Sequence, residues 1–244
     1  MDKLTVTCLG SGAALARDRL WSSLLLDERI LFSLPPTAVS QLHRLGKDLT
    51  AISHIFISHR HADHFFGLPF LLLYYSYLYS RDEPLYIIGP AGMQEATQCL
   101  FDLAWPDLKE RGIEPSVPII YVEVKMDGWF QAGEIEFQAL RMEHFSMVSY
   151  GYRFRYKGRD IAFTGDTGDC PQLCRLVDGA NVVITEFTHP RPSTDPGHMD
   201  ATAVSSLAQK LRTKGVSVLA THLEGEPTKI DGVTICHDGE TYQV

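Results

Sequence analysis

The residues best suited to chemistry lie in one short segment, His59-Arg-His61-Ala-Asp63-His64, directly after an apolar run that is typical of a buried strand. Imidazole nitrogens and carboxylate oxygens are common ligands of divalent metal ions. From a loop, His59 and His61 are spaced to converge on one ion, while Asp63 and His64 can turn toward a second. The alternative, a solvated polar turn, would need four ligand-type residues at this spacing by chance. The segment therefore predicts a metal centre.

Two ions need more ligands than one loop supplies, and three isolated residues farther along the chain fit this need. His144, Asp166 and His222 each stand just past an apolar run that we expect to be a strand. Loops at strand ends gather into one site. Asp166 follows Thr164 and Gly165, a setting that brings a carboxylate close to a metal, and a carboxylate can bridge two ions where a neutral imidazole cannot. These three residues complete the predicted ligand set.

The elements that must position these side chains are expected to be short strands interspersed with helices, an α/β pattern. Expected strands cover residues 4–9, 23–26, 30–32, 52–57, 85–88, 119–124, 135–140, 150–156, 160–164, 182–185 and 216–220. Expected helices cover residues 36–45, 69–79, 92–104 and 201–212. So many strands do not fit one open sheet in a chain of this length. We therefore predict two packed sheets with outer helices.

Composition places limits on the class of protein. The 244 residues are 45% hydrophobic and 21% charged, which indicates a globular chain, and we expect residues 1–244 to form a single domain. The net charge of −8 argues against a broad basic surface for nucleic acid. Five scattered cysteines without a Cys-x-x-Cys pair, and no visible signal peptide, lead us to expect a cytoplasmic protein. The longest apolar stretch, 65–79, is interrupted by Gly67 and Pro69, so we expect no membrane span.

The order His59-x-His61-x-Asp63-His64, then His144, Asp166 and His222, resembles the metallo-β-lactamase superfamily of dinuclear hydrolases. The resemblance implies a four-layer αββα sandwich with its site at one edge of the two sheets. It also implies that His59, His61 and His144 hold a first metal, that Asp63, His64 and His222 hold a second, and that Asp166 bridges them. The β-lactamase branch often has a cysteine at the bridging position, so Asp166 argues against antibiotic hydrolysis.

Further motifs resemble ribonuclease Z and its relatives, the branch that hydrolyses phosphodiesters. They are Leu9-Gly10-Ser11-Gly12, Ser22-Ser23-Leu24-Leu25-Leu26, Gly67-Leu68-Pro69 and Ser149-Tyr150-Gly151-Tyr152-Arg153. The resemblance implies a metal-dependent phosphodiesterase in which a metal-bridging hydroxide attacks the ester and Asp63 helps to orient it. A departing oxygen needs a proton, and we assign this role to His198, with Glu186 as the carboxylate that orients it. The alternative is that His198 only caps a helix and Glu186 is a surface acid.

Two departures from the ribonuclease Z pattern affect the expected substrate. Ser33 stands where that branch has an acidic, glycine-rich turn, which replaces a carboxylate that would orient a ligand. The long basic arm that clamps transfer RNA has no visible counterpart between residues 119 and 156. Together with the net charge, this leads us to expect a small or medium anionic ester as substrate rather than an extended RNA. A ribonuclease Z-type tRNA 3′ endonuclease is kept as an alternative.

Other interpretations stay open at this point. The same metal pair suits another ester class, such as a sulfate ester, a lactone or a thioester. A non-enzymatic binding module with a degenerate site is a third hypothesis, which the complete ligand set argues against. We expect two divalent ions, zinc first, and manganese or iron also suit His and Asp ligands. The aromatic run 65–79 either packs its own helix or forms a homodimer contact. Core or surface roles are expected for the remaining histidines, with His189 the nearest exception: His43, His54, His189 and His237.

Overall fold

The computed structural model describes residues 3–212 and 214–244, which form two seven-stranded sheets. The first sheet contains, in spatial order, β14 (Thr241–Gln243), β1 (Thr5–Gly10), β2 (Ser23–Leu26), β3 (Ile30–Phe32), β4 (His54–Phe56), β5 (Leu85–Pro90) and β6 (Ile119–Val124). The second contains β13 (Val233–Ile235), β12 (Ser217–Thr221), β11 (Val182–Glu186), β10 (Arg159–Phe163), β9 (Met147–Tyr156), β8 (Ile135–His144) and β7 (Gly128–Ala132). N-terminal and C-terminal segments thus share the first sheet.

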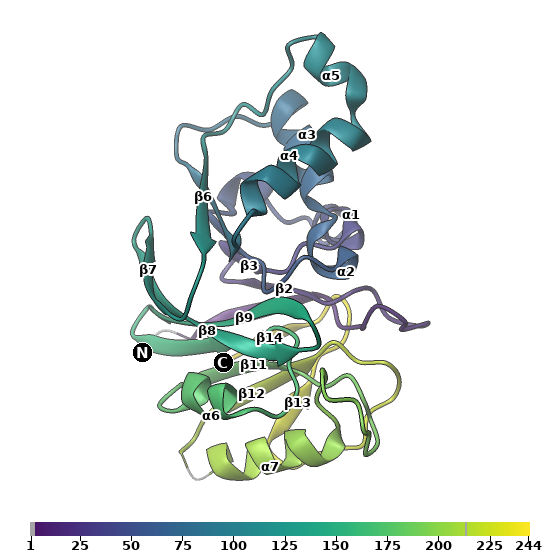
Figure 1. The fold of residues 1–244 in the computed structure, drawn as a ribbon, viewed down its shortest axis with the longest axis vertical. Coiled ribbons are helices and arrows are strands. Elements are labelled where there is room, and N and C mark those ends of the chain that lie inside the picture. The colour runs from purple at the N-terminus through teal and green to yellow at the C-terminus, as the bar shows by residue number, and fades with distance from the viewer. Residues whose placement is uncertain (1–2, 213) are drawn as a thin grey trace.

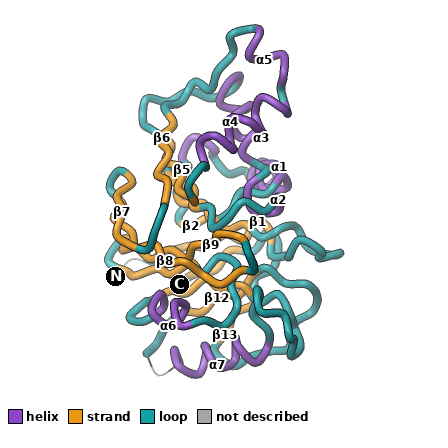
Figure 2. The backbone as a smooth tube through the Cα atoms, in the orientation of Figure 1, coloured by secondary structure: helices purple, strands orange, loops and turns teal. Residues whose placement is uncertain are grey.

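Helices cover the outer face of each sheet (Figure 1). The first sheet is covered by the first half of the chain, with α1 (Pro36–Arg44), α2 (Ala62–Phe65), α3 (Leu68–Tyr77), α4 (Met93–Ala104) and α5 (Pro106–Glu110). The second is covered by α6 (Pro171–Val177) and α7 (Ala201–Arg212). Figure 2 shows the strands of both sheets between these two sets of helices. The predicted four-layer αββα sandwich is confirmed.

Successive side chains of a strand point to opposite faces of the sheet. A short apolar run therefore contributes both to the core between the two sheets and to the core between a sheet and its outer helices. In β2, Leu24 and Leu26 pack between the sheets, while Leu25 packs against the helices on the outer face. Between the sheets, the ring of Phe154 lies parallel to that of Phe56, with centroids 5.1 Å apart. The ring of Phe32, which like Phe56 belongs to the first sheet, has its centroid 6.1 Å from that of Phe154. Aromatic packing therefore joins the two sheets.

Strand direction brings the ends of several strands to one edge. Strands β3 to β6 run parallel in the first sheet, and β10 to β13 run parallel in the second. Strand β9 runs antiparallel to both β8 and β10, so β8 points the same way as β10. In parallel arrangements the loops at the carboxyl ends of the strands form the usual binding crevice. The segments after β4, β10 and β12 are placed in such loops, whereas His144, expected just past a strand, is the last residue of β8.

The structure differs from the expected elements mainly in short segments. Strands β7, β13 and β14 and helices α2, α5 and α6 were not predicted, because so few residues carry too little periodic signal. Asp63 and His64 were expected in a loop but lie in α2, where their side chains come within 3.3 Å of each other. Among the described residues, no helix is both long enough and apolar enough to cross a membrane.

Candidate metal centre

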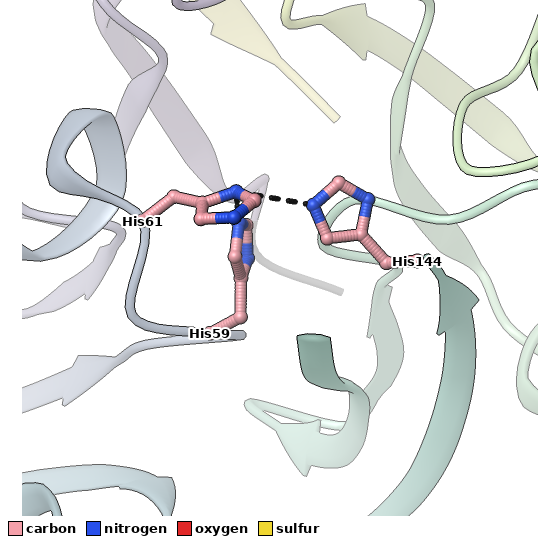
Figure 3. Close-up of side chains that lie close together, drawn as sticks. All are labelled: His59, His61 and His144. Atoms are coloured by element: carbon pink, nitrogen blue, oxygen red, sulfur yellow. Dashed lines mark hydrogen bonds between the residues drawn. The ribbon is translucent and has the colours of Figure 1, made fainter. Parts of the chain in front are cut away.

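Three histidines form the first group of candidate ligands (Figure 3). His59 Nε2 lies 2.9 Å from His61 Nδ1, and His144 Nε2 lies 3.2 Å from the same atom. His59 and His61 follow β4, whereas His144 is the last residue of β8, so the two sheets contribute to one group. His59 and His144 are buried, and His61 is half-buried. Nitrogens this close to one another are typical of imidazoles that share a cation.

Asp63, His64 and His222 form the second group, and Asp166 lies between the groups. Asp63 Oδ2 is 3.3 Å from His64 Nε2 and 3.4 Å from His222 Nε2. Asp166 Oδ2 lies 3.1 Å from His64 Nε2 and 3.3 Å from His222 Nε2. The same oxygen lies 3.7 Å from His59 Nε2 in the first group. The structure thus brings all seven predicted ligands together and places Asp166 where a bridging carboxylate would stand.

The imidazole and carboxylate donors of both groups fit divalent cations, and the environment of one buried nitrogen supports this independently. His64 Nε2 is buried without a hydrogen-bond partner, although it faces two carboxylates. Buried polar atoms of this kind are rare unless an ion or a water satisfies them. Within each group, the ligand atoms of the three residues all lie within 4.8 Å of one another. Every one of these atoms is an imidazole nitrogen or a carboxylate oxygen. These residues would suit zinc, manganese or iron.

The charges of the cluster shift the pKa values of its members. Burial opposes a charge on His64, but Asp166 and Asp63 outweigh it and raise the pKa of His64 to about 10. Against the effect of burial, a hydrogen bond with His222 and the neighbouring His64 ring hold the pKa of Asp63 well below its usual range. Burial lowers the pKa of His59, which favours the neutral ring that metal coordination requires. The same carboxylates that hold a proton on His64 would hold a cation.

The other nitrogen of most of these histidines is fixed by a neighbour, which orients each ring. His59 Nδ1 lies 3.0 Å from the Ser58 hydroxyl, and His64 Nδ1 lies 2.9 Å from the Ser33 hydroxyl. Ser33, at a φ of 59°, therefore occupies the position beside the ligand that a carboxylate was expected to fill. His144 Nδ1 donates to the Gly197 carbonyl at 2.9 Å, and His222 Nδ1 lies 2.8 Å from the Thr188 hydroxyl. Such partners fix which nitrogen faces the ligand.

Backbone conformation brings Asp166 to its place. Gly165 has a φ of 60°, and a Cβ there would lie 2.4 Å from the Ser58 Cβ. Only glycine allows this left-handed, crowded turn between β10 and Asp166 at low cost. His222 also has a positive φ, of 60°, directly after β12. Backbone strain of this kind is common at functional sites, where the surrounding structure holds it.

The buried Glu186 and the half-buried His198 form a pair beside the second group. His198 Nδ1 lies 3.0 and 3.2 Å from the two carboxylate oxygens of Glu186. Glu186 is only 2% exposed, so it is not a surface acid. The amide of Ala203 at the start of α7 donates to Asp200, which supplies the cap that His198 was alternatively expected to provide. Despite the opposing effect of burial, Glu186 raises the pKa of His198 to about 9.

The sequence of the chain matches the model of a known protein family. Residues 28–223 match the model of the β-lactamase superfamily domain, which is more than half of the chain. This chain is a metallo-β-lactamase superfamily member. Membership implies that it binds divalent metal ions, and the resemblance to the ribonuclease Z branch is also confirmed.

Among known proteins, this superfamily member is 34% identical over 153 residues to a ribonuclease Z of Methanosarcina acetivorans, which covers 61% of this chain and 47% of the relative. The solved structure of human tRNase Z, short form, has a TM-score of 0.75 at 25% identity and covers 98% of both chains. A diphosphatase from the PhnP family has the same fold, with a TM-score of 0.74 at 18% identity over 99% of this chain and 98% of the other. The chain spans about half the length of the ribonuclease Z relative.

These comparisons give no support to the expectation of a small or medium ester rather than an extended RNA as substrate. The relatives are named for action on RNA, and the net charge of the whole chain does not describe the field at a site with cations. The short connections expected between residues 119 and 156 are present, since β8 and β9 are joined by Phe145 and Ser146 alone.

Several contributors to the site had no sequence signal. Thr188 contacts Glu186, His198 and His222, yet a single threonine after a strand carries no pattern. His189, the expected exception among the remaining histidines, pairs with Asp195 at 3.0 Å and Glu224 at 3.3 Å, outside both ligand groups. His54 is buried and hydrogen-bonded to Ser53 and Ala132, as expected of a core residue.

Proposed function

We propose that this protein is a dinuclear metal-dependent phosphodiesterase. The observation that carries the proposal is the position of Asp166 Oδ2, between a three-histidine group and a group of two histidines and one aspartate. His59, His61 and His144 would hold one ion, and Asp63, His64 and His222 the other. Zinc is the first choice of metal, and manganese or iron would also suit these ligands.

When bound, two divalent cations at such a site lower the pKa of water and neutralise negative charge on a phosphoryl group. The protein's own residues orient the parts of this reaction. Ser58, Ser33 and the Gly197 carbonyl hold ligand rings in place. Asp63 presents an ionised carboxylate at the site, because its pKa stays well below the usual range. It is therefore placed to accept a hydrogen bond from the attacking water.

His198 is the proposed proton donor to the departing oxygen. Its Nδ1 is held by Glu186, so Nε2 is the nitrogen that would donate to the substrate. Its ring centroid lies 4.8 Å from that of His144 and 5.4 Å from that of His222, so it borders both ligand groups. The Glu186 carboxylate also accepts hydrogen bonds from the amides of Thr167 and Met199 and from the Thr188 hydroxyl. A carboxylate fixed in this way keeps the imidazole oriented.

An RNA 3′ endonuclease is the second candidate function, and the names of the relatives favour it. It uses the same metal pair and the same proton donor. It differs only in the size of the group attached to the scissile phosphate. A precursor transfer RNA with a 3′ extension therefore belongs beside small diesters in the assay.

Two measurements test the proposal. Elemental analysis of the purified protein is expected to give close to two transition-metal ions per chain, and one ion or none would contradict the dinuclear assignment. Turnover of bis(p-nitrophenyl) phosphate is then compared with that of aryl sulfate, lactone and thioester substrates. We expect the phosphodiester to be hydrolysed fastest. Turnover of a non-phosphate ester alone would show that the phosphodiesterase assignment is wrong.

A further inference from the structure

Phe145 stands at the edge of the metal centre with an unusual combination of properties. It forms the turn between β8 and β9 with Ser146, directly after the candidate ligand His144. Its side chain is 59% exposed, although phenylalanine is normally buried. Its φ is 50°, in the left-handed region that bulky residues rarely adopt and that asparagine or glycine would occupy at lower cost. Both the exposure and the backbone conformation are unfavourable for folding alone.

The ring is nevertheless held in a defined place. Its centroid lies 5.1 Å from that of His144 and 5.7 Å from that of His198, at interplanar angles of 52° and 73°. A Cβ on Gly197 would lie 2.5 Å from two carbons of the ring, so the absence of a side chain there lets the ring pack directly against the Gly197 backbone. Gly197 is itself fixed, because its amide donates to Asp195 and its carbonyl accepts from His144. The position of the Phe145 ring is thus fixed by contacts with His144, His198 and Gly197, which also belong to the metal centre or orient its ligands.

These contacts leave part of the ring open beside the reacting groups. Both histidine rings meet Phe145 at steep angles, so they do not cover it by stacking. A substrate with its phosphate against the candidate ligand His144 and the proposed donor His198 would lie beside this ring, whose centroid is 5.1 and 5.7 Å from theirs. Aromatic side chains exposed in this way are the usual platforms on which nucleobases stack, whatever the base.

We propose that Phe145 is a specificity-determining residue that stacks on a nucleobase attached to the phosphoester. The inference rests on the proposed function, since it takes the phosphate to lie at the metal centre. Stacking suits a chain with a net charge of −8, because it adds affinity without basic side chains. A planar base gains binding affinity by stacking on a planar aromatic ring, whereas an alkyl chain gains similar affinity from any apolar side chain.

Binding to the zinc-loaded protein tests this directly by calorimetry. The two probes are adenosine 5′-monophosphate and ribose 5-phosphate, in which a hydroxyl at C1′ replaces the base. Phe145→Ala and Phe145→Leu are expected to weaken binding of the nucleotide on the order of tenfold, and Phe145→Trp to preserve it. Ribose 5-phosphate is expected to bind all four proteins alike. Trp129→Ala is the matched control, because Trp129 is also exposed but pairs with Gln138 toward the other end of β8.

Each contrary outcome overturns the assignment. Equal binding of the two probes to the unaltered protein, or equal loss of both in Phe145→Ala, would show that the ring does not recognise a base. Full nucleotide affinity in Phe145→Leu would show an apolar contact that suits an alkyl group instead. Hydrolysis of bis(p-nitrophenyl) phosphate is measured in parallel. If that hydrolysis is absent while the nucleotide preference persists, the proposed function fails and the stacking assignment stands.

Discussion

Replacing His198 by alanine separates proton donation from metal binding. The ring borders both ligand groups, and its Nδ1 is held 3.0 Å from Glu186, so the variant removes a preoriented donor. General acid catalysis contributes about 10²- to 10⁴-fold to such reactions. We therefore expect His198→Ala to slow cleavage of a dinucleotide by that factor, which corresponds to roughly 3–5 kcal/mol of activation free energy.

The leaving group decides whether the reasoning is correct. A dinucleotide releases an alkoxide that must be protonated, whereas p-nitrophenolate is stable near neutral pH and leaves unaided. The variant should thus lose far more activity on the dinucleotide than on bis(p-nitrophenyl) phosphate, with the metal content of the protein unchanged. Glu186→Gln keeps a hydrogen-bond acceptor beside His198 but loses the charge, so we expect a smaller loss on the same substrate. Equal slowing on both substrates, or loss of metal, would refute the proton-donor role.

Four further outcomes follow from the contacts described above. Ser33→Ala removes the hydroxyl at 2.9 Å from His64 Nδ1 and is expected to weaken metal binding about 10- to 100-fold in a chelator competition; unchanged affinity would contradict the role of Ser33. Phe154→Ala should lower the free energy of unfolding in urea by about 3–5 kcal/mol, because the ring is 1% exposed between the sheets. Gly67→Ala places a Cβ 2.4 Å from the Pro35 carbonyl oxygen and should destabilise by about 1–3 kcal/mol, whereas Gly225→Ala meets nothing within 4 Å and serves as control. Zinc at about 100 times its Kd should stabilise the folded protein by about 2.7 kcal/mol, and a melting temperature that does not rise would count against a preformed site.

The ligand residues could be recognised from sequence because their types and spacing are local. His59, His61, Asp63 and His64 stand within one short segment, and Asp166 and His222 each follow a run of apolar residues. The strands that deliver them were predictable for the same reason, since several of these runs are apolar throughout and become buried strands of the two sheets. Short elements such as α2 were missed, because four residues define no period.

The residues that hold the ligands in place could be recognised only in the folded protein. Thr188 reaches His222 and Glu186 across the ends of two strands, and Gly197 reaches His144 across a long separation in sequence. A hydroxyl or a carbonyl carries no pattern of its own, so its role depends on which atoms the fold brings within hydrogen-bonding distance. The sequence by itself determined which side chains can bind metal, and the tertiary structure decided which atoms orient them and that Phe145 stands exposed beside them. The physical reason is that ligand chemistry belongs to a side chain, whereas orientation and exposure belong to its neighbours.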